Sequence, residues 1–211
     1  MTSHFDHLAA LIVGAIILGT VAVLQQRDVS STMETTMSHA ARARAEVLLD
    51  VVSQDAENLL TTVQAADLGI PHAIQLESDG ERTTGATLTS FVRTSPSAYG
   101  PATVRYDLAD TGRTVVVGQD TVSLFRVTRR VGTEAPHVVG EEVVDLDLAF
   151  SSAGADVTNG PPPADVTQVR VGVAVAAPAP RGRASDQRST SETHLVRMGT
   201  TLRPINLPPQ D

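Results

Sequence analysis

The sequence predicts an α+β protein in which a long N-terminal helix, formed by a membrane anchor and an amphipathic stalk, packs on an antiparallel β-sheet domain. Three patterns predict this: an uncharged apolar run over 8–24, a stripe of small and apolar residues continuing to Ala66, and alternating segments beyond Pro71. The expected units are a tail and anchor helix (1–27), a stalk helix (28–68), a β-rich domain (69–203) and a short tail (204–211).

The apolar run is the predicted anchor. It reads LAALIVGAIILGTVAVL, and Thr20 is its one polar side chain. As a helix it covers about 26 Å, slightly less than the roughly 30 Å hydrocarbon core of a bilayer. A cleaved signal peptide and a buried core helix are the alternatives, but the preceding MTSHFDH has no Lys or Arg. We therefore expect a single-pass protein in contact with membrane lipid, with an orientation that the flanking charges do not fix.

The stalk is predicted from apolar residues spaced three and four apart. They are Met33, Met37, Ala41, Ala45, Leu48, Val52, Ala56, Leu59, Val63 and Ala66. Charged residues, Asp55 among them, lie largely off this stripe, and no proline interrupts residues 8–68. Anchor and stalk are therefore expected to form one helix of about 60 residues, roughly 90 Å long, ending near Leu68 before Gly69 and Pro71. Met33 and Met37 are interpreted as core or interface filler, and a dimeric coiled coil is the weaker alternative because heptads with Leu are absent.

The rest of the chain predicts strands with one wet face. The segments are 86–93, 103–108, 113–118, 121–130, 141–150, 167–176 and 193–202. In the fifth, Val144, Leu146, Leu148 and Phe150 are expected to face one way; in the sixth, Val169, Val171, Val173 and Val175 form the inner row. Residues 109–112 (Ala-Asp-Thr-Gly) have turn composition and predict a hairpin, and flexible loops are expected near 151–166 and 177–192.

The composition disfavours several classes of function. The net charge is −8 and every basic side chain is Arg, which argues against nucleic acid as a partner. There is no Cys, and no phosphate-binding or serine-hydrolase motif occurs. The His spacing fits no zinc site, and alternation puts Asp145 and Asp147 of an acidic cluster on a solvated strand face. We therefore expect no enzyme, cofactor, metal or small-molecule substrate.

One sequence feature keeps an enzyme hypothesis open. Asp110-Thr111-Gly112 matches the motif of aspartic peptidases, in which two such carboxylates share a proton. The chain has one copy, so a peptidase would have to dimerise. Asp and Gly also satisfy the backbone of an ordinary turn, which is the favoured interpretation.

The order of these segments resembles the type IV pilin fold, and most nearly the larger minor pilins and the minor pseudopilins of type II secretion. The resemblance rests on RARAEVLLDVVSQDAENLL (42–60), TVRYDL (103–108), SLFRVTRR (123–130), EEVVDLDLAF (141–150), QVRVGVAVA (168–176) and VRMGTTLRPINL (196–207). It implies a bacterial inner-membrane protein with an extracytoplasmic C-terminal domain, which assembles with sister subunits in a surface or periplasmic filament.

The resemblance also implies assembly residues in the N-terminal helix. Gly14 and Gly19 would permit close helix approach, and Met33 and Met37 would contribute to the interface. The family has a Gly before its peptidase cut and a Glu at the fifth mature position, and this sequence has neither. Counting from Thr2, Asp6 occupies that fifth position. The alternative to a filament subunit is a permanently anchored extracytoplasmic binding module.

Overall fold

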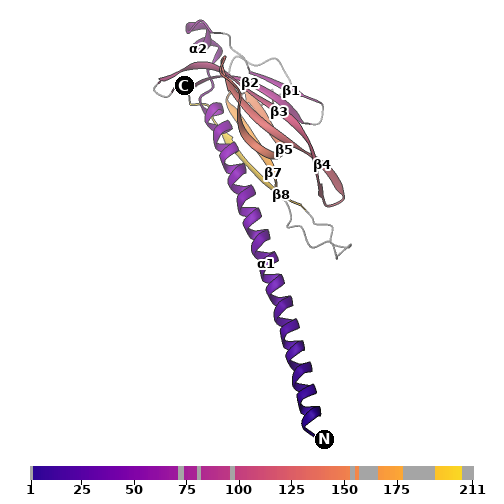
Figure 1. The fold of residues 1–211 in the computed structure, drawn as a ribbon. Coiled ribbons are helices and arrows are strands. Elements are labelled where there is room, and N and C mark those ends of the chain that lie inside the picture. Colours follow the sequence, from indigo (N-terminus) through magenta and orange to yellow (C-terminus); the bar gives the residue numbers. More distant parts are fainter. Residues whose placement is uncertain are drawn as a thin grey trace.

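The protein is a long helix with a curled antiparallel sheet around its C-terminal part (Figure 1). The computed structural model describes residues 2–70, 74–79, 82–95, 98–152, 155–156, 166–177 and 193–205, with side chains of residues 2–10, 30, 95 and 155–156 left aside. Helix α1 runs over Thr2–Glu57, 56 residues, which corresponds to about 84 Å. The predicted α+β class, with a long N-terminal helix on an antiparallel sheet, is confirmed.

Helix α1 ends at Glu57, earlier than the predicted end near Leu68. Residues 58–60 leave the helix to pair with the second strand: the Leu60 N–H donates to the Thr89 carbonyl at 3.0 Å, and the Phe91 N–H donates to the Asn58 carbonyl at 2.9 Å. These bonds replace helical ones and bury Leu59 and Leu60. The apolar stripe alone could not reveal this competition.

A second short helix, α2 (Thr62–Asp67), follows the break. Thr61 caps it: the Gln64 N–H donates to Thr61 Oγ1 at 3.1 Å, and the Thr61 N–H donates to Gln64 Oε1 at 2.9 Å. Gly69, with φ of 67°, ends α2 instead of α1. Val63, expected on the buried stripe, is 66% exposed.

The strands form one antiparallel sheet in the order β1-β2-β3-β4-β5-β7-β8, and β6 pairs with β5. Their bounds are β1 Ile74–Ser78, β2 Thr83–Ser95, β3 Ala98–Val117, β4 Asp120–Val131, β5 His137–Ser152, β6 Ala155–Asp156, β7 Gln168–Ala177 and β8 His194–Leu202. All seven predicted segments lie mainly in strands, whereas β1 and β6 were not predicted. Most of the expected loops 151–166 and 177–192, and the tail from residue 206, lie outside the described residues.

The predicted hairpin at 109–112 is wrong. Strand β3 continues through this segment, and its pairing with β4 shifts between Asp110 and Arg113. The extra residues form a bulge in which Gly112 has φ of 69°. The real turn lies at Gly118 and Gln119, between β3 and β4. Turn-forming residues therefore mark a bulge here because Asp and Gly suit both structures.

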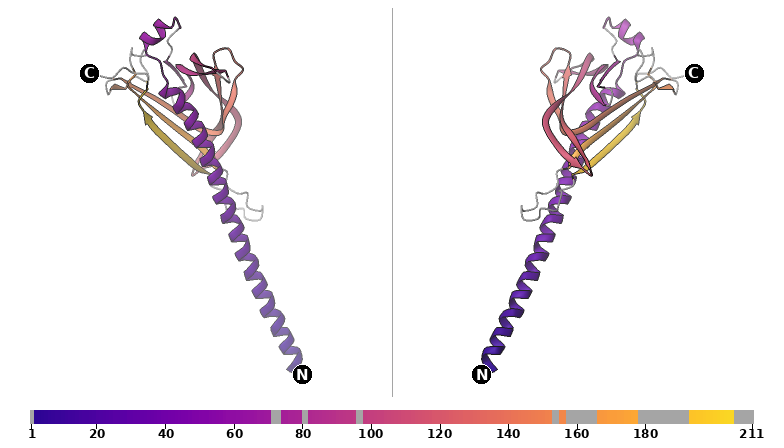
Figure 2. Two further views of the ribbon diagram at one scale, coloured as in Figure 1. Left: turned by 90° about the vertical axis from the view of Figure 1, so that its left-hand side faces the viewer. Right: turned by 90° about the vertical axis from the view of Figure 1, so that its right-hand side faces the viewer.

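The core lies between α1 and the concave side of the sheet, which curls around the helix (Figure 2). Ala45, Leu48 and Val52 of α1 are completely buried. They pack in one cluster with the predicted inner row of β7: Val169, Val171, Val173 and Val175. Leu146, Leu148 and Phe150 of β5 join this cluster as predicted.

Val144 does not join the predicted row of β5. The register between β5 and β7 shifts between Val143 and Asp145, so Val143 takes the position in the main core. Val144 packs instead in a second, smaller cluster with Leu124 and Ala174. A bulge therefore breaks an alternation that looks continuous in the sequence.

Candidate functional site

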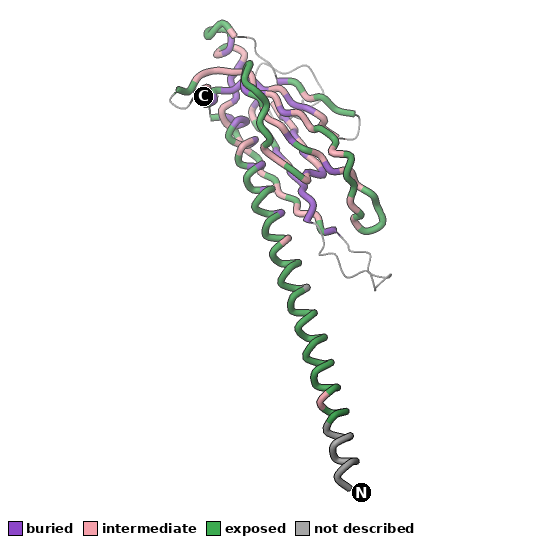
Figure 3. The backbone as a smooth tube through the Cα atoms, in the orientation of Figure 1, coloured by how far each residue is buried: buried purple, intermediate pink, exposed green. Residues whose placement is uncertain are grey.

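The first candidate site is the part of α1 that extends away from the sheet. Side chains described over 11–40 are exposed or half-buried, and full burial begins at Ala41 (Figure 3). Large apolar side chains dominate its beginning; Leu11 is 73% exposed and Leu18 is 71% exposed. Within the described residues, α1 is the one helix long and apolar enough to span a membrane. This segment therefore presents an apolar surface that the protein's own domain does not cover.

Several threonine hydroxyls in this segment form hydrogen bonds with the backbone of the helix itself. The hydroxyls of Thr20, Thr32, Thr35 and Thr36 each donate to the carbonyl four residues earlier, at 2.8 to 2.9 Å. A hydroxyl bonded in this way leaves no unsatisfied donor toward an apolar neighbour. The threonines are therefore compatible with contact between this helix and lipid or another helix.

The predicted assembly residues are distributed along α1 and do not form one cluster. A Cβ added at Gly14 or Gly19 would meet nothing within 4 Å, so both positions are open. Five residues of helix place them about 140° apart, so they would contact different neighbours. Met33 and Met37 do lie together, along a shallow groove of about 360 Å³ beside Val29. Asp6 lies in α1, and its side chain is outside the described residues.

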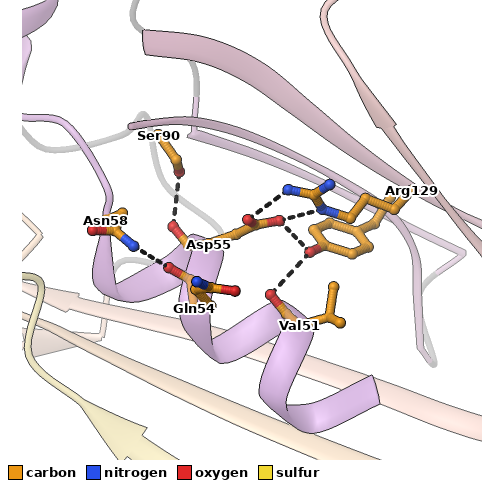
Figure 4. A network of polar contacts seen from close by, with 7 residues as sticks. Val51, Gln54, Asp55, Asn58, Ser90 and Arg129 are labelled. Atoms are coloured by element: carbon orange, nitrogen blue, oxygen red, sulfur yellow. Dashed lines mark hydrogen bonds and ion pairs between the residues drawn. The ribbon is translucent and has the colours of Figure 1, made fainter. Parts of the chain in front are cut away.

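The second candidate site is a polar network that joins the end of α1 to the sheet (Figure 4). Arg129 of β4 donates from Nε to Asp55 Oδ2 at 2.7 Å and from Nη2 to Asp55 Oδ1 at 2.8 Å. The Tyr106 hydroxyl donates to Asp55 Oδ2, and Ser90 Oγ donates to the Asp55 carbonyl at 2.8 Å. Asp55 is 3% exposed, so its predicted place off the buried stripe is wrong.

The electrostatics of this network hold both partners of Asp55 in their protonated forms. Hydrogen bonding to Asp55 raises the pKa of Arg129 above its ordinary value. Burial, and after it the Asp55 charge, raises the pKa of Tyr106 well above 10. The three groups thus form a paired, hydrogen-bonded unit inside the fold. The sequence signal for it was weak: an Asp within one turn of Val52, Ala56 and Leu59.

Further contacts connect α1 to the strands nearer the point where the helix leaves the domain. Glu142 is bound by Arg44 of α1 and, at 3.4 Å, by Arg113 of β3. Glu34 of α1 lies 3.2 Å from the imidazole of His194 in β8. These solvent-accessible pairs add contacts between α1 and the sheet to those of the buried Asp55 network.

Asp110 and two carboxylates of the acidic cluster over 141–147 have partners within the fold. Asp110 Oδ1 accepts the Gly112 N–H at 2.8 Å within the β3 bulge. In the acidic cluster, Glu141 lies 3.7 Å from Arg126, and Asp147 lies 3.2 Å from Arg170. No group of three or more potential metal ligands occurs within the described part of the chain. Burial, and after it Asp147, raises the pKa of Asp145.

Comparison of the chain with protein-family profiles, curated proteins and solved structures found no significant match.

Proposed function

We propose that the protein is a structural subunit, a minor pilin or minor pseudopilin, of a type IV pilus or a type II secretion-like filament. In this proposal α1 first anchors the chain in the bacterial inner membrane, with the domain extracytoplasmic, and then packs against the helices of sister subunits. The proposal assigns the protein no catalytic role, and in it Asp55, which is bound by Arg129 and Tyr106, serves to hold α1 on the sheet.

The observation that carries the proposal is the division of α1 into two parts. The domain fully buries no described side chain over 11–40, where Ile12, Ile16 and Ile17 are exposed, while Ala41–Ala56 supplies the stripe that the sheet buries. A bilayer can cover the apolar part while the protein is in the membrane. Neighbouring helices can cover the same surface in a filament, where small residues permit close contact.

The test is co-purification from membranes of the protein's own host. A Gly14→Leu variant adds a side chain at an open helix position without lowering its hydrophobicity, so membrane insertion should persist. Val13→Leu at a neighbouring exposed position is the matched control, because it changes shape but removes no small residue.

We expect the wild-type chain and Val13→Leu to co-purify with sister subunits and to enter a sheared filament fraction. Gly14→Leu should stay in the membrane and lose most of this association. A wild-type chain that inserts in the membrane yet recovers no sister subunit would contradict the proposal and favour the anchored binding module.

A further inference from the structure

A cleft of about 310 Å³ lies where the last turns of α1 meet β2 and β3. One wall includes Gln54 of α1 and Asn58, which follows the end of that helix; both lie beside the Asp55 network in Figure 4. Phe91, Arg93 and Tyr99 contribute from the strands, and Arg129 lines the interior. The cleft thus combines amide groups, aromatic rings and guanidinium groups, which are the groups that recognise oxygen-rich ligands.

Arg129 supplies a cation whose position is fixed in advance. Its Nε and Nη2 both bind Asp55, so the side chain cannot swing without breaking two charge-assisted hydrogen bonds. The third nitrogen, Nη1, makes neither of these contacts, and the side chain is 22% exposed where it lines the cleft. A ligand carboxylate would therefore meet an arginine that needs no further ordering.

The aromatic rings lie next to a second arginine. Arg93 of β2 pairs directly with Tyr99 of β3, and Phe91 lies two residues before Arg93, so all three project from the same side of the two strands. Phe91 is 41% exposed and Tyr99 is 63% exposed. A molecule with six aromatic residues in total, four Phe and two Tyr, thus presents two of them around one cleft.

The charge of the cleft is opposite to that of the whole chain. Arg93 and Arg129 against Asp55 leave one positive charge among the lining residues, whereas the chain as a whole carries −8. The net positive charge of the lining residues favours an anionic ligand.

We propose that this cleft binds an acidic saccharide. One of its carboxylates would pair with Arg129 and another with Arg93, the apolar face of a sugar ring would pack on Tyr99 or Phe91, and a hydroxyl would bond the side-chain amide of Gln54. An acidic peptide fits less well, because residues 58–60 already occupy the β2 edge that an added peptide strand would use. This proposal does not rest on filament assembly.

The test measures binding of tetragalacturonate to the full chain in lipid nanodiscs by calorimetry. Maltotetraose is the neutral saccharide control, and tetra-aspartate is a peptide of equal charge. Arg93→Gln and Tyr99→Ala change surface residues of the cleft, so the fold should persist. Arg42→Gln lies about three turns of α1 before the cleft, has a side chain that is 65% exposed, and is the matched arginine control.

We expect saturable binding of tetragalacturonate that weakens about 10-fold in Arg93→Gln and about 3-fold in Tyr99→Ala. Arg42→Gln should bind like the wild type, and maltotetraose should bind at least 10-fold more weakly, in line with loss of the charged contacts. The proposal is overturned by the absence of saturable binding, by equal binding of maltotetraose or tetra-aspartate, or by cleft variants that match the control.

Discussion

At the residue scale, the pair of Asp55 and Arg129 is the least exposed ion pair between α1 and the sheet among the described residues. Both groups leave water, and the bidentate geometry with the added Tyr106 hydroxyl compensates for that loss. A pair of this kind fixes one rotation of the helix on the sheet, because any other rotation would bury an unpaired charge. It therefore aligns the apolar segment of α1 relative to the domain.

Asp55→Asn should lower the free energy of unfolding of the domain by about 3 kcal/mol, because it leaves a largely buried guanidinium without its counter-charge. Urea unfolding followed by circular dichroism in detergent micelles measures this. Asp147→Asn is the control, since its pair with Arg170 is exposed, at 49% and 65%, and should contribute about 0.5 kcal/mol or less. Equal effects of the two variants would show that the Asp55 network does not hold the helix.

Tyr106 makes the stability of the folded protein depend on pH in the alkaline range. Its pKa is raised in the folded protein, so above about pH 10 the unfolded chain loses the phenol proton before the folded one does. Stability is thus complete below pH 10 and decreases as the pH rises toward the folded pKa. The chain has no Lys and no Cys, so neither of these residue types adds to the pH dependence in this range.

Tyr106→Phe should flatten the decrease in unfolding free energy above about pH 10, because the replaced ring has no proton to lose. Urea midpoints at a series of alkaline pH values measure the slope. Tyr99→Phe is the matched control, because Tyr99 is 63% exposed. If the two variants keep the same slope as the wild type, Tyr106 is not the group responsible.

At the scale of elements, the predictions from sequence succeeded where one periodicity dominates. Alternation in 141–150 and 167–176 predicted β5 and β7 and most of their buried rows. The stripe predicted that Ala41, Ala45 and Leu48 would be buried. The helix end was missed because residues 58–60 exchange helical hydrogen bonds for bonds to β2, a long-range competition that leaves no local signal.

The bulge in β3 is a second feature that the local sequence pattern failed to predict. Gly112 adopts φ of 69° and is held by Asp110, so the segment has the composition of a turn while the strand continues. The Asp55 network was also not predictable, since Arg129 is 74 positions away along the chain. Pattern thus predicts the elements, whereas pairings between distant residues decide bulges, helix ends and buried polar contacts.

Gly112→Ala should destabilise the domain by about 1 kcal/mol, because a residue with a Cβ is strained at this positive φ. The same urea titration measures the change. Gly100→Ala at the far end of β3 is the control, because its added Cβ would meet Thr94 at an ordinary 3.7 Å and its φ is not positive. A loss in Gly100→Ala as large as in Gly112→Ala would contradict the role assigned to the bulge.

At the scale of the whole molecule, the continuous helix α1 has two parts with different surroundings. Its C-terminal part is the central element of the domain core, and its N-terminal part is an apolar rod that the domain leaves uncovered. Full burial begins at Ala41, within the predicted stalk (28–68), so the domain leaves the first part of that stalk uncovered, with Met33 46% exposed. The central claim is that other helices cover the rod after it leaves the lipid.

Cysteine cross-linking in membranes and in the sheared filament fraction of the native host tests this claim most directly. The chain contains no Cys, so one introduced in turn at each position over 11–24 is the single reactive thiol of the subunit. We predict disulfide-linked adducts with sister subunits carrying a cysteine in the corresponding helix, at positions that recur every three to four residues, since one helix face meets each neighbour. No adduct at any position, in a chain shown to be membrane-inserted, would contradict the claim.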